Sequence, residues 1–287
     1  MMVPGQGHVH FHHRDVEDRL GVRLGVSSFA AIRQPLQEVE AALSSYGVGV
    51  EVMCEPPHAW PAPVPWNGGG LLSLHMPILG INLASTNPGI REESVRQVLA
   101  TVREAARLGA RGVVVHPGLP PYEEVFPRDR GLPYAVESLR RIAEAAGAVG
   151  LEVYLENMPA ISLADGAPPI AFAYGVRYEE LRDIYARVGH PSLRLCLDLG
   201  HAYLAGAREL EALLADRDVV HVHVSDNRGR RDDHLAWGDG EIAKRVDLAR
   251  DLPDSVRTII FEVKSLEACR TSLDRVASEL VSRREQR

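Results

Sequence analysis

The stretch GVVVHPG, residues 112–118, is a run of apolar residues that ends in a histidine, a proline and a glycine. A continuous valine run is typical of a parallel strand that helices cover. A second apolar run occupies residues 259–261. Helical patterns, with apolar residues three and four positions apart, occupy residues 92–108 and 135–149. Strands that alternate with helices predict βαβ units and a parallel sheet.

The same reading predicts eight strands in all. They are expected at residues 24–29, 47–54, 71–76, 112–116, 152–156, 193–198, 219–224 and 258–262, with further helices at 178–188 and 265–284. A chain of 287 residues with eight such units is of the right length for one α/β barrel. We therefore predict a single (β/α)8 TIM barrel over residues 23–287. Residues 1–22 are expected to form a poorly ordered amino-terminal arm.

Composition narrows the classes of protein. Hydrophobic residues make up 45% and charged residues 25%, which favours a globular chain over a disordered one. The net charge of −7 gives no global basic field for nucleic acid. Three widely spaced cysteines without a CxxC pair argue against a disulfide framework or a thiolate zinc site. The arm has no apolar core, so neither signal peptide nor membrane anchor is predicted, and we expect a cytoplasmic enzyme.

Polar residues fall at the ends of six consecutive predicted strands. These are His75, His116, Glu156, Asp198, His223 and Glu262, and nearby positions add His201, Asp232 and His234. Buried carboxylates and imidazoles need compensation, which a divalent cation supplies. Imidazole and carboxylate ligands without cysteine suit Zn²⁺ or Mn²⁺. The sequence therefore predicts a metal site at the carboxyl ends of the strands.

Short motifs at these strand ends resemble a known family. They are His-Pro-Gly after the fourth strand, Glu-Asn after the fifth and Asp-x-x-His after the sixth. The seventh strand carries His-x-x-Asp, followed by Asp-x-His and Gly-x-Gly. The chain resembles the xylose-isomerase-like barrel superfamily from Leu24 to its end. That superfamily joins sugar-phosphate isomerases and epimerases to the endonuclease IV enzymes (AP endonuclease family 2).

The two branches of this superfamily imply different metal sites. The isomerase and epimerase branch implies one metal held by Glu156, Asp198, His223 and Glu262, with His201 touching the substrate. The endonuclease branch implies a three-zinc cluster that adds His75, His116, His201, Asp232 and His234. All of these positions carry suitable residue types here. One to three Zn²⁺ or Mn²⁺ ions per chain are therefore expected.

Two chemistries remain open at this point. Isomerisation takes a proton from a carbon beside a carbonyl, with Glu156 and Glu262 as base and acid. Hydrolysis of a phosphodiester needs an activated hydroxide and cations around the phosphoryl oxygens. Residues 55–70 contain no arginine or lysine, although residues 83–85 resemble an endonuclease loop. The favoured function is a sugar or sugar-phosphate isomerase or epimerase.

The alternative is a hydrolase that acts at abasic DNA sites, and only this alternative requires a nucleic-acid partner. A non-catalytic metal-binding barrel is less favoured, because the carboxylate pair is intact. No membrane partner is expected, and the sequence leaves the oligomeric state open.

Several further residues are candidates for substrate contact. They are Asn157, His201, Asp226, Arg228 and Trp60. Trp60 and Trp66 suit a wall or lid over the substrate, or a surface connection. Arg228 belongs to a basic stretch with Arg230 and Arg231. This stretch could bind a substrate phosphate, or it could be a solvated loop. His221 is expected to lie in a hydrogen-bonded layer behind the ligands.

Overall fold

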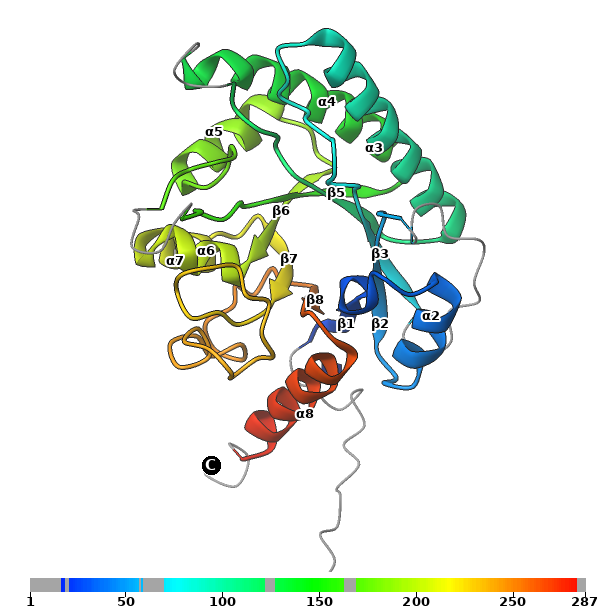
Figure 1. The fold of residues 1–287 in the computed structure, drawn as a ribbon, viewed down its shortest axis with the longest axis vertical. Helices are drawn as coiled ribbons and strands as arrows, with labels where there is room; N and C mark the ends of the chain where they lie inside the picture. Colours follow the sequence, from blue (N-terminus) through cyan, green and yellow to red (C-terminus); the bar gives the residue numbers. More distant parts are fainter. Residues whose placement is uncertain are drawn as a thin grey trace, which may run out of the picture.

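Eight parallel strands form a closed barrel in the computed structural model, which describes residues 17–18, 21–56, 58, 70–121, 127–162 and 169–282. Each strand pairs with its neighbours in sequence, and β1 pairs with β8 to close the barrel. The helices pack around this barrel (Figure 1). The predicted α/β barrel is therefore confirmed.

The predicted amino-terminal arm lies mostly outside the described residues. Within it, the Glu17 carboxylate accepts a hydrogen bond from the Leu24 backbone N–H at 2.8 Å.

The strands agree closely with the predicted ranges. They are β1 (Arg23–Ser27), β2 (Gly49–Met53), β3 (Leu71–His75), β4 (Gly112–Val115), β5 (Glu152–Glu156), β6 (Leu193–Asp198), β7 (Val219–Val224) and β8 (Thr258–Phe261). The bounds of β5, β6 and β7 match to the residue. His116 and Glu262 each come one residue after the strand to which they were assigned. They follow the end of the hydrogen-bonded ladder directly, so their side chains still reach the carboxyl face.

The helices differ more from the prediction. They are α2 (Leu36–Ser44), α3 (Pro88–Leu108), α4 (Leu132–Ala148), α5 (Tyr178–Val188), α6 (Leu199–Ala205), α7 (Ala207–Leu214) and α8 (Leu266–Ser282), with 3-10 turns η1 (Ser28–Ala31) and η2 (Arg128–Gly131). Helix α3 begins earlier than predicted because Asn87 caps it, accepting from the Gly89 N–H at 2.9 Å. Pro88 at its first position fits there because it lacks an N–H. The short helices α2, α6 and α7 were not predicted.

The connection from β7 to β8, residues 225–257, contains no helix and is organised by a buried carboxylate. The Asp226 side chain has no exposed surface. Its oxygens accept hydrogen bonds from the backbone N–H groups of Asn227, Gly238 and Ile242 at 2.9, 3.0 and 2.8 Å. Three such bonds fix a long loop on the face of the barrel where the strands end.

No helix among the described residues is both long and apolar enough to cross a bilayer.

The barrel interior requires glycine where β4 approaches β5. A Cβ on Gly112 would lie 2.6 Å from the Glu152 backbone oxygen and 2.7 Å from the Tyr154 ring. We expect Gly112→Ala to lower the free energy of unfolding by about 1–3 kcal/mol, as other overpacked cores do. Urea denaturation measures this change. Gly89→Ala is the control, since its nearest contact would be Asn87 Oδ1 at 3.4 Å. Equal stability of Gly112→Ala and the native chain would contradict the packing described.

Candidate metal centre

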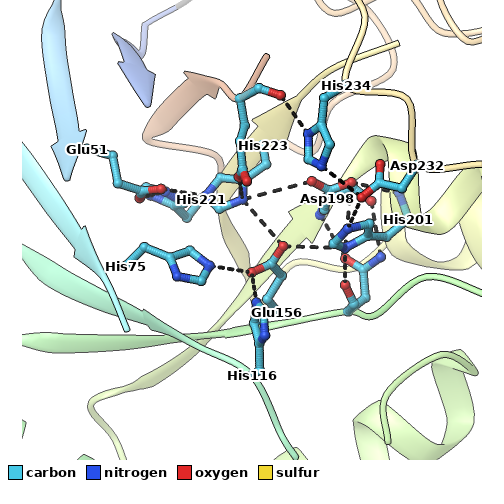
Figure 2. A network of polar contacts seen from close by, with 12 residues as sticks. Glu51, His75, His116, Glu156, Asp198, His201, His221, His223, Asp232 and His234 are labelled. Carbon is cyan, nitrogen blue, oxygen red and sulfur yellow. Dashed lines mark hydrogen bonds and ion pairs between the residues drawn. The ribbon is translucent and has the colours of Figure 1, made fainter. Parts of the chain in front are cut away.

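Polar side chains from successive strands meet at the carboxyl end of the barrel (Figure 2). The innermost group comprises Glu156, Asp198, His223 and Glu262, whose ligand atoms lie within 4.8 Å of one another. Their exposed fractions are 2%, 0%, 0% and 6%, so this group is shielded from bulk water. Glu156, Asp198 and His223 lie at or near the ends of β5, β6 and β7, and Glu262 directly follows β8. The closed barrel brings together residues that are far apart in the sequence.

The Glu156 carboxylate faces two sets of imidazoles. Its Oε2 lies 3.2 Å from His75 Nε2 and 3.0 Å from His116 Nε2. Its Oε1 lies 3.4 Å from both His201 Nδ1 and His223 Nδ1. His75, His116 and Glu156 thus form a second group that could hold a metal. Glu156 is in the position of a carboxylate that could bridge two ions.

A third group gathers around Asp232 in the loop after β7. Its Oδ2 lies 3.1 Å from His201 Nε2 and 2.8 Å from His234 Nε2. The structure therefore brings all nine predicted ligand positions into one network. Their action as ligands stays a prediction.

The Asp-x-x-His motif after β6 has a local cause. Asp198 is the amino-terminal cap of α6, and its Oδ1 accepts a hydrogen bond from the His201 backbone N–H at 2.7 Å. Capping leaves Asp198 Oδ2 free to face the centre of the site. It also places the His201 ring beside that carboxylate.

Three of the histidines are oriented by main-chain carbonyls. The Nδ1 atoms of His75, His201 and His234 lie 2.8, 2.9 and 2.9 Å from backbone oxygens. A carbonyl only accepts, so the proton of each neutral ring stays on Nδ1 and the Nε2 lone pair is free. Histidines that ligate metals are oriented in this way. His234 also has a left-handed backbone, with φ of 45°, which a non-glycine residue adopts only at an energetic cost.

Several buried atoms of the described site lack hydrogen-bond partners. They include Asp198 Oδ2, His223 Nδ1, Glu262 Oε2 and Asp232 Oδ1. Unpaired buried polar atoms are rare because each costs free energy. His223 Nδ1 and Glu262 Oε2 lie 2.7 Å apart without hydrogen-bond geometry, so both atoms can face one cation. The residues present therefore fit a divalent metal, and their oxygen and imidazole donors suit Zn²⁺ or Mn²⁺.

Protons balance the charge of this site when no ion does. Burial raises the pKa of Glu156, but the charges of His223 and His116 outweigh burial and hold it well below its usual range. Burial also raises the pKa of Asp198 to about 6, with further raising from Asp232 and Glu156. Burial lowers the pKa of His201, but the Asp198 and Asp232 carboxylates raise it well above its ordinary value. A metal must displace such protons, so its affinity falls as pH falls.

The other predicted contacts lie in different places. Asn157 braces the backbone of Asp198, with Oδ1 accepting at 2.8 Å and Nδ2 donating at 3.1 Å. The Asp226 carboxylate is engaged by the loop that it organises. The Arg228 side chain is 64% exposed and lies 4.0 Å from Asp233. Trp60 lies outside the described residues, as does Trp66.

One residue of the network was missed by the sequence analysis. Glu51 of β2 is completely buried beneath the innermost group, and its carboxylate lies 3.0 Å from both His221 Nε2 and His223 Nε2. His221 thus lies behind the predicted ligands. The available signal was an acidic residue inside the apolar run Val50-Glu51-Val52, because a buried charge needs a partner.

A family model described as the xylose isomerase-like TIM barrel matches residues 16–272. The chain belongs to this family. The match confirms the resemblance inferred from the motifs at the strand ends.

Proteins similar to this chain have different names. An uncharacterized protein of Methanocaldococcus jannaschii is 29% identical over 237 residues, covering 78% of this chain and 77% of the relative. A probable endonuclease 4 of Mycobacterium tuberculosis is 28% identical over 232 residues, covering 76% and 84%. A solved structure described as a D-tagatose 3-epimerase-like protein has a TM-score of 0.77 and 26% identity, covering 92% and 99%.

The orphaned atoms predict that metal stabilises the fold. We expect Zn²⁺ or Mn²⁺ to raise Tm above its value in a chelator. At a metal concentration a thousandfold above the dissociation constant, the free energy of unfolding should rise by up to about 4 kcal/mol. Asp198→Asn should lose most of this shift, because Asn can still cap α6 but lacks the anionic oxygen. Asp233→Asn is the matched control in the β7 loop. A Tm that does not depend on metal would refute the site.

Proposed function

We propose that this chain is a divalent-metal-dependent isomerase or epimerase of a sugar or sugar phosphate. The observation that carries the proposal is the placement of two carboxylates around one metal-ligand group. Glu262 Oε2 lies 2.7 Å and Glu156 Oε1 lies 3.4 Å from the same atom, His223 Nδ1. These carboxylates come from the ends of β8 and β5, which lie three strands apart around the barrel. They can therefore approach a bound substrate from different sides.

The carboxylates supply the proton chemistry. The neighbouring imidazoles oppose the effect of burial and lower the pKa values of both Glu156 and Glu262. Both side chains are thus held as anions, the form that accepts a proton from carbon. One of them suffices to shift a proton between adjacent carbons, whereas inversion of a stereocentre requires a donor on the opposite side. An ion bound by Glu156, Asp198, His223 and Glu262 would polarise the carbonyl and hydroxyl oxygens of the substrate.

The surroundings of the site suit a small substrate. The innermost group is buried, while the His116 side chain is 18% exposed and the Asp232 side chain 25%. Substrate would therefore enter past His116 and the β7 loop. The likeness to a solved protein described as D-tagatose 3-epimerase-like supports a sugar as the substrate class.

A specific observation also favours hydrolysis of a phosphodiester. A reaction with one Lewis acid does not require the second group at Glu156 Oε2 or the third group around Asp232, yet both are assembled. Two or three ions would instead suit the attacking and leaving oxygens of a displacement at phosphorus. The relative named probable endonuclease 4 supports this second candidate. Nucleic acid would then be the substrate.

The carboxylate pair is tested by isosteric substitution. We expect Glu156→Gln and Glu262→Gln each to slow proton exchange by about 10²–10⁴-fold, the usual contribution of a general acid or base. The measurement is incorporation of deuterium from solvent into a panel of sugars and sugar phosphates. Glu55→Gln is the control, because Glu55 is a buried carboxylate that contacts loop backbone N–H groups outside the ligand network. Exchange that survives both site substitutions would rule out the proposed acid and base.

The two histidines of the second group separate the candidate reactions. If proton transfer at carbon is the function, His75→Ala and His116→Ala should retain activity within about tenfold, since one Lewis acid is sufficient. If hydrolysis is the function, either substitution should abolish turnover. The assays are deuterium exchange and cleavage of duplex DNA with an abasic site, combined with elemental analysis. Three metals per chain with efficient strand cleavage would overturn the isomerase proposal, and exchange without cleavage would support it.

A further inference from the structure

The Glu51 carboxylate is a buried charge that directly contacts a predicted metal ligand. Its side chain has no exposed surface, and its carboxylate is directed at His221, at the left of the network in Figure 2. A buried carboxylate is retained only where nearby donors compensate it. Among the described residues, one hydroxyl and two imidazoles contact this carboxylate.

The contacts of Glu51 divide between its two oxygens. Oε2 accepts a hydrogen bond from Ser73 Oγ at 2.6 Å and lies 3.0 Å from His221 Nε2. Oε1 lies 3.0 Å from His223 Nε2. The His221 ring is itself held in place, because it stacks on the Tyr154 ring with centroids 4.6 Å apart and planes at 10°. Ser73 and His221 therefore hold Oε2 of Glu51 in place, and this leaves Oε1 directed at His223.

This contact determines which nitrogen of His223 can bind a metal. The contact between Oε1 and Nε2 is an ion pair without hydrogen-bond geometry, and an anionic oxygen at 3.0 Å favours a proton on that nitrogen over a lone pair. The neutral ring then has its lone pair on Nδ1. That atom lies 2.7 Å from Glu262 Oε2, 3.4 Å from Glu156 Oε1 and 3.9 Å from Asp198 Oδ2.

We propose that Glu51 is the positioning residue of the metal centre. The charge of its Oε1 keeps a proton on Nε2 of His223, so that Nδ1 presents its lone pair to the ion that Glu156, Asp198 and Glu262 would share. The proposal rests on the metal site of the proposed function and is independent of which reaction the site performs.

His223 differs from the other oriented histidines in the kind of partner it has. His75, His201 and His234 are held by backbone carbonyls, which no substitution removes. His223 depends on a side chain. A carboxylate also makes the ring that it contacts a stronger donor to metal, which a neutral carbonyl does to a lesser degree. Glu51 therefore acts on both the orientation and the affinity of this ligand.

The substitution Glu51→Gln distinguishes the effect of the Glu51 charge on His223 from the effect of its side-chain volume on packing. The glutamine amide has nearly the same shape but only one acceptor atom, whereas both His221 and His223 present Nε2 to this carboxylate. One imidazole must then move its proton to Nδ1. For His223 that tautomer cannot bind the ion.

The test compares Glu51→Gln with the matched control Glu55→Gln, in the full chain. Metal affinity is measured by competition with a chelator, using Zn²⁺ as the probe. We expect the dissociation constant to rise about 10–100-fold in Glu51→Gln, the usual effect of removing such a partner, and to stay unchanged in Glu55→Gln. A lower Tm without any loss of zinc affinity would mean that Glu51 is only structural, and would overturn the proposal.

A spectroscopic measurement on the native chain needs no variant and applies even if Glu51→Gln does not fold. Nitrogen-15 NMR of the histidine rings in the zinc-loaded protein should show His223 protonated at Nε2 and ligating through Nδ1. The same spectrum of Glu51→Gln should show a weakened or mixed pattern at His223, while His75, His201 and His234 stay unchanged. Zinc bound to His223 Nε2 in the native chain would overturn the proposal.

Discussion

The Glu156 carboxylate is buried among four imidazoles, whose nearest nitrogens lie between 3.0 and 3.4 Å from its oxygens. Burying this charge would be prohibitively costly without compensation, and the rest of the site provides it. Protons on the imidazoles compensate it in one state, and cations compensate it in another. At His75 a backbone carbonyl retains the proton on Nδ1, so Nε2, the nitrogen that faces Glu156, is the one that could exchange a proton for a metal. If a metal binds here as proposed, its release would be coupled to proton uptake.

The barrel holds these charged side chains together at one place. Parallel strands of a closed barrel end at one face, so residues spread over the sequence from His75 to Glu262 meet without long flexible connections. Apolar residues fill the layers below, including the inner cluster of Val114, Tyr154, Cys196 and Val220. The loops carry the remaining ligands, and the β7 loop is rigid enough to do so because Asp226 fixes its backbone at three points.

The sequence predicted the strands well, and it predicted which polar side chains meet at the strand ends, because both depend on local patterns. β5, β6 and β7 are apolar runs with a polar residue at or near the end, and their limits were placed to the residue. Glu51 was missed because its partner His221 lies 170 positions away and no periodicity connects them. The short helix α2 was not predicted because its apolar pattern extends over only nine residues. Orientation of the histidine rings depends on carbonyls supplied by other segments, which only the folded chain reveals. The role of Asp226 in fixing the β7 loop could not be predicted, because its backbone partners Gly238 and Ile242 lie more than ten positions along the chain.

Charge balance explains how one scaffold can support both reaction classes. Glu156 Oε1 belongs to the innermost group, while Oε2 faces His75 and His116. Burial lowers the pKa of His75, but the Glu156 carboxylate more than reverses this and raises it to about 9. At neutral pH a protonated His75 can therefore balance Oε2, and one ion in the innermost group completes the site. If an ion took the place of that proton, His75, His116 and Glu156 would hold it, beside the ion proposed for the innermost group. Of the two proposed reactions, proton transfer at carbon would need only the first state and displacement at phosphorus would need the second. The two proposals therefore differ in whether a proton or an ion lies between Glu156 and the pair His75 and His116.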